Sequence, residues 1–232
     1  MGLRVDEFRR CLYSYERMTQ SSLAQTTSTV GASTRAVLLE AARGAFARNG
    51  FDGASVRMIT SDAEVNLGAI TYHFGSKRGL YDAVLEEGLR PLLRRVREAS
   101  EQPGTSLDRM MAVVEAYFEH LATHPDLPHL MLQEVAAGRE PPNVVLEIIR
   151  EVKGTIAGLQ QAGVADGSVR EGHPVLMALS VASQPIYLTL ITPLLRSVAG
   201  LDLTEPATRQ MVIEHVSDFV RRGLTPHIEA TR

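Results

Sequence analysis

The 232-residue sequence predicts an all-α protein with two domains. Helix-favouring residues fill most of it, aromatic residues make up only 5%, and there is no Trp. Apolar residues recur three and four positions apart, and no segment alternates between apolar and polar residues as a strand would. Polar or Gly/Pro-rich breaks divide the chain, first into short helices and then into long ones. We therefore expect a small N-terminal helical domain and a larger C-terminal helical bundle.

Residues 1–32 are expected to form a flexible N-terminal extension. They end in a Ser/Thr-rich stretch with little periodicity, although residues 6–18 could form a short helix. Two interpretations stay open for this segment. Either its four arginines touch the phosphates of a nucleic acid, or it is an exposed and disordered arm.

Residues 33–80 are expected to form one domain of short helices. Side chains that can cap a helix N-terminus and glycines that can end a helix recur within it. The expected N-caps are Ser33 or Thr34, Ser55, Asn66 and Ser76, and the expected terminating glycines are Gly50 and Gly75. Short helices cannot each bury much apolar surface, so they must share a core. Its expected members are Phe46, Phe51, Val56, Ile59, Val65, Ile70 and Phe74.

Residues 81–228 are expected to form a bundle of longer helices. The predicted spans in this part of the chain are 76–99, 106–123, 126–137, 141–162, 174–199 and 205–223. Pro185 and Pro193 should disturb the fifth span, because proline lacks a backbone hydrogen-bond donor. Apolar stripes on the last two helices exceed what one subunit needs, which predicts a two-fold interface between copies. The stripes contain Leu176, Leu179, Ile186, Leu190, Leu194, Val212, Val216 and Val220.

Composition narrows the cellular setting. The single cysteine, Cys11, excludes an intramolecular disulfide and a Cys-rich zinc motif, and it fits a reducing compartment. Charged residues at positions 6–10 interrupt what would be the apolar core of a secretory signal. The most apolar stretch, 175–195, is broken by two prolines, so we expect no membrane span. The sequence predicts a cytoplasmic protein.

The net charge of −3 is unevenly distributed along the chain. Residues 1–32 carry +1, residues 33–80 carry +2, and residues 81–232 carry −6. The small basic excess thus lies in the N-terminal part. This distribution is compatible with a nucleic-acid reader attached to an acidic domain of another function.

Residues 55–85 carry the main functional signal. A short helix, a turn of three or four residues and a second helix follow one another there. The expected outward positions of the second helix are small or hydrogen-bonding, so it can enter the major groove of DNA, which is about 12 Å wide. They are Gly68, Ala69, Thr71, Tyr72 and His73. Tyr72, His73 and Lys77 can also hold phosphates, as can the free amides of the helix that begins after Ser76.

This segment resembles the TetR family of bacterial repressors. The resemblance lies in AlaPheAlaArgAsnGlyPhe (45–51), SerValArgMetIle (55–59) and TyrHisPheGlySerLys (72–77), and it covers residues 34 to about 85. It implies a dimer that binds a palindromic operator and is released by a small-molecule effector in the C-terminal domain. It also implies that the base edges are faced by Leu67, Gly68, Ala69 and Thr71, and the DNA backbone by Tyr72, His73 and Lys77.

One position departs from the family pattern. The turn usually carries Gly where this chain has Glu64. If the position requires a positive φ, Glu costs about 1 kcal/mol relative to Gly. We expect the surrounding core to absorb this strain.

Candidates for ligand binding in the C-terminal domain rest on weaker patterns. Polar residues in apolar surroundings are the better candidates, whereas aromatic and Met residues either line a pocket or fill the core. The expected set is Tyr117, Phe118, Met131, Gln133, Glu134, Gln184 and Tyr187. His120 and His124 share a helix face, as metal ligands do, but the helix ends at His124 and a structural role is preferred. We expect no metal and no cofactor.

The sequence therefore predicts a ligand-responsive repressor whose partners are operator DNA, a small-molecule effector and a second copy of the chain. An enzyme is not expected, because no catalytic set of residues has recognisable spacing. Two alternatives stay open. One is a helical carrier or enzyme with chemistry in its C-terminal pocket, and the other is a DNA-binding regulator that works by corepression or as an architectural protein.

Overall fold

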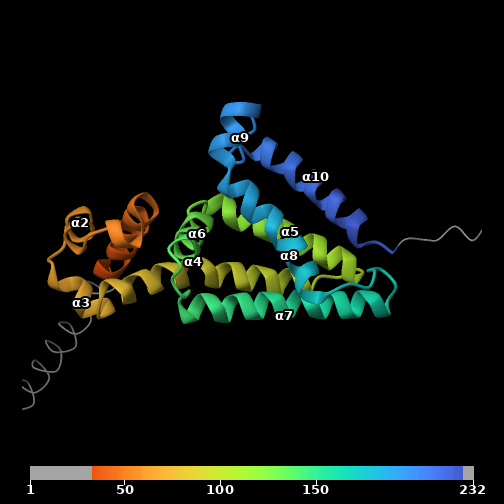
Figure 1. The fold of residues 1–232 in the computed structure, drawn as a ribbon, viewed down its shortest axis with the longest axis horizontal. Coiled ribbons are helices and arrows are strands. Elements are labelled where there is room, and N and C mark those ends of the chain that lie inside the picture. The colour runs from red at the N-terminus through yellow and green to blue at the C-terminus, as the bar shows by residue number, and fades with distance from the viewer. Residues whose placement is uncertain (1–32, 227–232) are drawn as a thin grey trace, which may run out of the picture. The chain divides into compact units, whose positions relative to one another are not determined.

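The computed structural model describes residues 33–226, in which all regular structure is helical (Figure 1). The predicted N-terminal extension lies outside these described residues. The chain divides into two compact units, Met1–Tyr81 and Asp82–Arg232. The all-α prediction, with a helix-turn-helix domain before a helical bundle, is confirmed.

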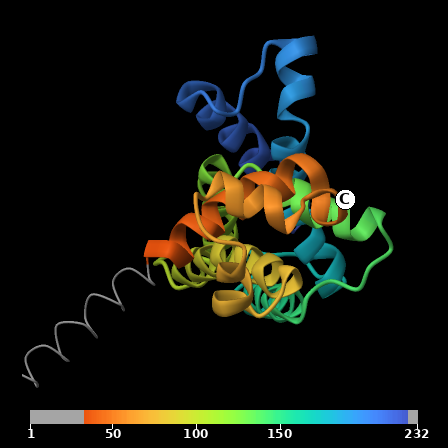
Figure 2. The same cartoon turned by 90° about the vertical axis from the view of Figure 1, so that its left-hand side faces the viewer.

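The first unit contains a helix at residues 33–53, followed by α2 (Val56–Asp62), α3 (Gly68–Phe74) and the start of α4 (Lys77–Ser100). Figures 1 and 2 show its short helices crossing one another rather than running parallel. The fully buried side chains include Leu38, Phe46, Ile59, Ile70, Leu80 and Tyr81. The rings of Phe46 and Tyr81 meet edge to face at 4.9 Å, which ties the first residues of α4 to this core.

The helix boundaries follow local capping chemistry. The Ser55 hydroxyl accepts a hydrogen bond from the Met58 amide at 3.0 Å, as predicted for the start of α2. Gly75 ends α3 with a φ of +74°. Two expectations are wrong. Gly50, although its φ is +70°, lies inside the helical run 33–53, and Leu67 rather than Asn66 occupies the N-cap of α3, without a capping side-chain hydrogen bond.

The second unit continues α4 and adds six helices within the described residues. They are α5 (Ser106–Thr123), α6 (Leu127–Ala136), α7 (Asn143–Ala165), α8 (Pro174–Leu190), α9 (Thr192–Ala199) and α10 (Pro206–Leu224). α5 packs against α7, α8 and α10, so it forms the centre of the bundle. Figure 1 shows α7 alongside the C-terminal part of α4, where Arg97 and Glu151 form an ion pair. This arrangement surrounds an interior bounded by α4, α5, α7 and α8.

The proline-rich span 174–199 is two helices rather than one. α8 and α9 meet at 66° around Ile191, just before Pro193, whereas Pro185 lies inside α8 without ending it. Pro193 is at the first turn of α9, where the missing amide costs little. Within residues 33–226 no single helix is long and apolar enough to cross a membrane. α8 and α9 pass that test only as a bent pair, by length and composition.

Candidate DNA interface and ligand cavity

The exposed face of α3 is narrower than the sequence predicts. Tyr72 is 84% exposed and Leu67 51%, and Gly68 and Thr71 are exposed as well. Ala69, expected to point outward, is only 7% exposed and is buried beside Ile70. The expectation is wrong because alanine fits either face of a helix, so its side could not be read from the apolar pattern. Ala69 is therefore not available for the base contact that was expected of it.

The turn before α3 has the predicted strained geometry. Glu64 has a φ of +54°, the one positive value at a non-glycine residue in the described part of the chain. Its neighbour Val65 donates a backbone hydrogen bond to the Thr60 carbonyl at 3.0 Å, which closes the turn after α2. The turn between α2 and α3 thus forms with Glu64 at the position where the family usually has glycine.

Lys77 is held by its own domain. Its Nζ lies 4.6 Å from the centre of the Phe51 ring and donates to the Asp52 carbonyl at 3.5 Å. His73 is half-buried and meets the Tyr72 ring edge to face at 4.9 Å. These contacts fix both side chains beside α3, and their contact with phosphate stays a prediction.

Gly79 matters for this surface, although the sequence pattern did not single it out. A β-carbon at this position would collide with the carbonyl oxygen of Phe74 at the end of α3. The Ser76 hydroxyl accepts a hydrogen bond from the Gly79 amide at 3.0 Å, which caps the N-terminus of α4 as predicted. Because it has no β-carbon, Gly79 permits the close approach of the start of α4 to the end of α3. A glycine in the first turn of a helix was the available signal.

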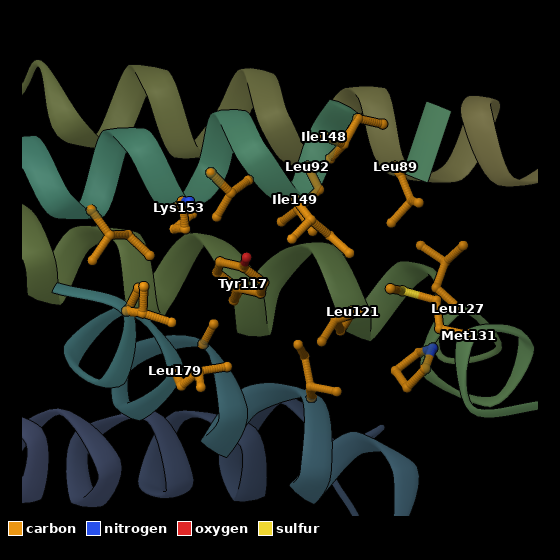
Figure 3. Close-up of a pocket in the computed structure, with 17 residues that line it drawn as sticks. Leu89, Leu92, Tyr117, Leu121, Leu127, Met131, Ile148, Ile149, Lys153 and Leu179 are labelled. Carbon is orange, nitrogen blue, oxygen red and sulfur yellow. The ribbon is translucent and has the colours of Figure 1, made fainter. Parts of the chain in front are cut away.

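A cavity of about 290 Å³ lies within the second unit, among α4, α5, α6, α7 and α8 (Figure 3). Its lining residues are apolar except for Tyr117 and Lys153, which are the two that carry a polar side-chain group. The most deeply buried lining residues include Leu121, Leu127 and Ile156. Tyr117 is 5% exposed, and burial raises the pKa of its phenol, so the hydroxyl stays neutral. Such a cavity suits a small molecule with a large apolar body.

The predicted ligand-binding residues do not form one site. Tyr117 and Met131 line the cavity, whereas Phe118 is buried beside a separate space of about 40 Å³. Gln184 lies in a shallow groove beside α10, and Tyr187 is exposed. Gln133 and Glu134 are absent from the cavity lining, and Glu134 pairs with Arg139 at 3.0 Å.

The sequence pattern also missed cavity residues, because apolar residues of long helices look alike whether they face a cavity or a core. Leu89, Leu92, Ile148, Ile149, Lys153 and Leu179 are examples.

The His120 and His124 rings stack at 4.3 Å but do not converge on a metal position. The buried His120 Nε2 contacts the Gly88 carbonyl at 2.8 Å, and His124 Nδ1 contacts the Thr123 hydroxyl at 2.9 Å. In the described residues, no group of three or more His, Cys, Asp or Glu side chains could hold a metal ion. His120 therefore joins α5 to α4, whereas the contacts of His124 are with the last turn of α5 itself.

An apolar surface covers parts of α8, α9 and α10. The stripe residues Leu176, Leu179 and Leu194 are more than half exposed, as the predicted interface requires. Val216 and Val220 are instead buried in the bundle, each 4% exposed, because α10 turns that face toward α5. Exposed apolar residues that the sequence pattern missed are Tyr187, Val198, Met211 and Phe219.

Comparison with known proteins decides the family. Residues 38–84 match the model of bacterial regulatory proteins of the tetR family, and residues 107–220 match a tetracyclin repressor-like C-terminal domain. The chain belongs to the TetR family. The predicted resemblance is thus confirmed and extends beyond the helix-turn-helix into the C-terminal part of the chain.

Relatives of this TetR-family chain are transcriptional regulators. The repressor NicS of Pseudomonas putida is 26% identical over 82% of this chain and 92% of its own length. The structure of the ketosteroid regulator KstR2 of Mycobacterium tuberculosis has a TM-score of 0.67 at 21% identity, covering 83% of this chain and 95% of its own. FadR of Bacillus subtilis with stearoyl-CoA has a TM-score of 0.61 at 19% identity, covering 78% and 96%. The two structures show a shared fold.

Proposed function

We propose that this TetR-family chain is a dimeric repressor that binds a palindromic operator through α3 and is released by a small apolar effector. The observation that carries the proposal is the exposed face of α3. The strained turn at Glu64 precedes this helix, and Gly75 ends it. A seven-residue helix with Thr71 and Tyr72 outward can lie in a major groove. Because an operator-binding regulator acts on chromosomal DNA, a cytoplasmic location accompanies the proposal.

Leu67, Gly68 and Thr71 are proposed to face base edges, and Tyr72, His73 and Lys77 to face phosphates. With Ala69 buried, Thr71 is the one hydrogen-bonding side chain among the proposed base contacts, while Leu67 can meet a thymine methyl. Direct readout is therefore sparse. We infer that DNA shape contributes to sequence preference, since positions without base contacts can still be read through deformability.

The exposed apolar surface on α8, α9 and α10 is proposed to bury itself against a second copy. A shallow groove of about 360 Å³ between α8 and α10 is lined by apolar residues such as Leu176 and Phe219 beside polar ones such as Gln184. An isologous interface there would cover these residues on both copies at once. A dimer is also what reading two half-sites of a palindrome requires.

The effector is proposed to occupy the 290 Å³ cavity. KstR2 is a ketosteroid transcriptional regulator, and the FadR structure is a complex with stearoyl-CoA. Ketosteroids and stearoyl-CoA both have extensive apolar parts, and the cavity lining here is apolar. Leu89 and Leu92 belong to α4, the helix that starts in the DNA-binding unit, so an occupant can act on that helix directly. A regulatory rather than catalytic role agrees with relatives that are named as regulators.

Titration of the protein against DNA from its own promoter region, followed by fluorescence anisotropy at several salt concentrations, tests the proposal. Thr71→Ala should relax preference at particular base pairs by about 1–3 kcal/mol. Tyr72→Phe, which removes only the exposed hydroxyl, should weaken binding to all sequences alike. Wild-type binding by both variants would reject α3 as the recognition helix. An added effector that tightens DNA binding would establish corepression instead of release.

A further inference from the structure

One residue with a charged side chain lines the cavity in the second unit. Of the residues that line it, only Lys153 carries a charge and only Tyr117 carries a hydroxyl. Lysine is rare in this chain: of its 24 basic residues, 22 are arginine and two are lysine, at positions 77 and 153. A lysine has a flexible apolar stem that can lie along an apolar wall while its ammonium reaches toward solvent or a partner.

Neither polar group has a partner in the described part of the chain. Lys153 is exposed and makes no hydrogen bond or ion pair with any residue of 33–226. Tyr117 is almost fully buried, yet its hydroxyl forms no hydrogen bond within the same residues. A tyrosine hydroxyl that faces the cavity without a partner from the described residues is free to donate a hydrogen bond to a polar atom of an occupant.

The cavity has a polar part and an apolar end. Figure 3 shows the Lys153 nitrogen and the Tyr117 oxygen away from the end formed by Leu89, Leu127 and Met131. Ile149, one helical turn before Lys153 on α7, is 46% exposed, and Lys153 itself is exposed, which places the opening along α7. An occupant would therefore place its polar group near Lys153 and its apolar body toward Leu127.

We propose that the effector is a carboxylic acid with an unbranched or slender apolar body, whose carboxylate pairs with Lys153 and accepts a hydrogen bond from Tyr117. This inference rests on the proposed function, because it assigns the chemistry of the effector in the same cavity. A water molecule takes up about 30 Å³ of the liquid, and at that volume per non-hydrogen atom the cavity holds roughly ten atoms, the number of carbons in decanoate. One ammonium balances one carboxylate, so the free acid fits better than an activated ester with several phosphates.

Calorimetric titration with decanoate, 1-decanol and decanoyl-CoA tests the proposal. Decanol has the same ten-carbon chain length but lacks the charge, and decanoyl-CoA replaces the carboxylate by a thioester to coenzyme A, which bears phosphates. Decanoate should bind about fivefold more tightly than decanol at low salt, the upper range for a solvent-accessible ion pair. Lys153→Met should abolish this preference, and Tyr117→Phe should reduce it. Arg150→Met, which removes an exposed charge from the same helix outside the cavity, should leave the preference unchanged.

The outcomes separate the two proposals. Equal affinity for decanoate and decanol, or a preference that survives Lys153→Met, would overturn the carboxylate assignment and leave an apolar effector cavity. Tighter binding of decanoyl-CoA than of decanoate would overturn the proposal that the effector is a free acid. If no decyl compound bound, both the carboxylate and the cavity's role would be rejected, while DNA binding, measured separately, would decide whether the chain is still an operator-binding protein.

Discussion

The buried imidazole of His120 contacts the carbonyl oxygen of Gly88 at 2.8 Å, joining the last turn of α5 to the middle of α4. A carbonyl can only accept, so Nε2 of His120 carries the proton. Gly88 also lies close to α6, since a β-carbon there would come within 2.5 Å of the Leu127 side chain. Three helices thus meet at one point, beside Leu89 and Leu127 of the cavity wall.

His120→Phe should destabilise the second unit. Phenylalanine occupies similar space but cannot donate to the Gly88 carbonyl, and loss of a buried hydrogen bond costs about 1–3 kcal/mol. Denaturant unfolding measures the change. His129→Phe is the control, because the His129 contact with the Pro125 carbonyl is longer, at 3.4 Å, and less buried. Equal effects of the two substitutions would show that the His120 contact contributes nothing specific.

Gly79→Ala should destabilise the DNA-binding unit by more than about 2 kcal/mol, because the new methyl group meets the Phe74 backbone rather than a movable side chain. DNA affinity should fall with it. Gly154→Ala is a control of opposite sign. Gly154 lies exposed in α7 with open space around its β-carbon position, so alanine should stabilise the protein by about 0.5–1 kcal/mol. Thermal unfolding of both variants provides the comparison. A Gly79→Ala protein as stable as the wild type would contradict the expected collision with the Phe74 carbonyl oxygen.

Glu64→Gly should leave stability unchanged or raise it by up to about 1 kcal/mol. Glycine adopts a φ of +54° without the β-carbon strain that Glu64 carries. The same change at Glu115, exposed in the middle of α5, should cost about 1 kcal/mol, because glycine is a poor helix former. Unfolding free energies that fell equally in both variants would argue against strain at the turn.

Asp166 should make the stability of the second unit depend on acid pH. Its carboxylate accepts hydrogen bonds from Ser168 and Ser106, which lower its pKa from 3.8 to about 2. The carboxylate is charged in the folded protein at a pH where the unfolded chain is partly protonated. Its stabilising contribution is therefore complete above about pH 4 and lost as the pH falls toward 2. Asp166→Asn should show a smaller drop in melting temperature than the wild type between pH 5 and 3.

Phe219→Asp should dissociate the proposed dimer. Phe219 is 64% exposed on α10 beside the groove with Leu176, and a carboxylate there would be buried without a partner on both copies. Light scattering at micromolar concentration measures the mass. Leu132→Asp, at an exposed apolar position on α6, is the matched control and should stay dimeric. A Phe219→Asp protein of unchanged mass would place the interface elsewhere.

Local chemistry explains what the sequence could predict. The Ser55 and Ser76 caps, the Gly75 end and the positive φ at Glu64 depend on neighbours within a few residues. The cavity depends on which turns of five helices face one another, and no local pattern distinguishes Lys153 from any other lysine on a helix. Ala69 was misplaced for a related reason, because a small residue gives no periodic signal of its orientation.

Because the chain has only two lysines, chemical labelling of each lysine can report on a different ligand. Apart from the N-terminal amine, an amine-directed reagent finds one ε-amino group in each unit, at Lys77 near α3 and at Lys153 in the cavity. Mass-spectrometric footprinting can follow both on the same molecules. Protection of Lys77 would record operator occupancy, and protection of Lys153 effector occupancy. The anticorrelation of the two signals would then measure how strongly one ligand expels the other, without any engineered label.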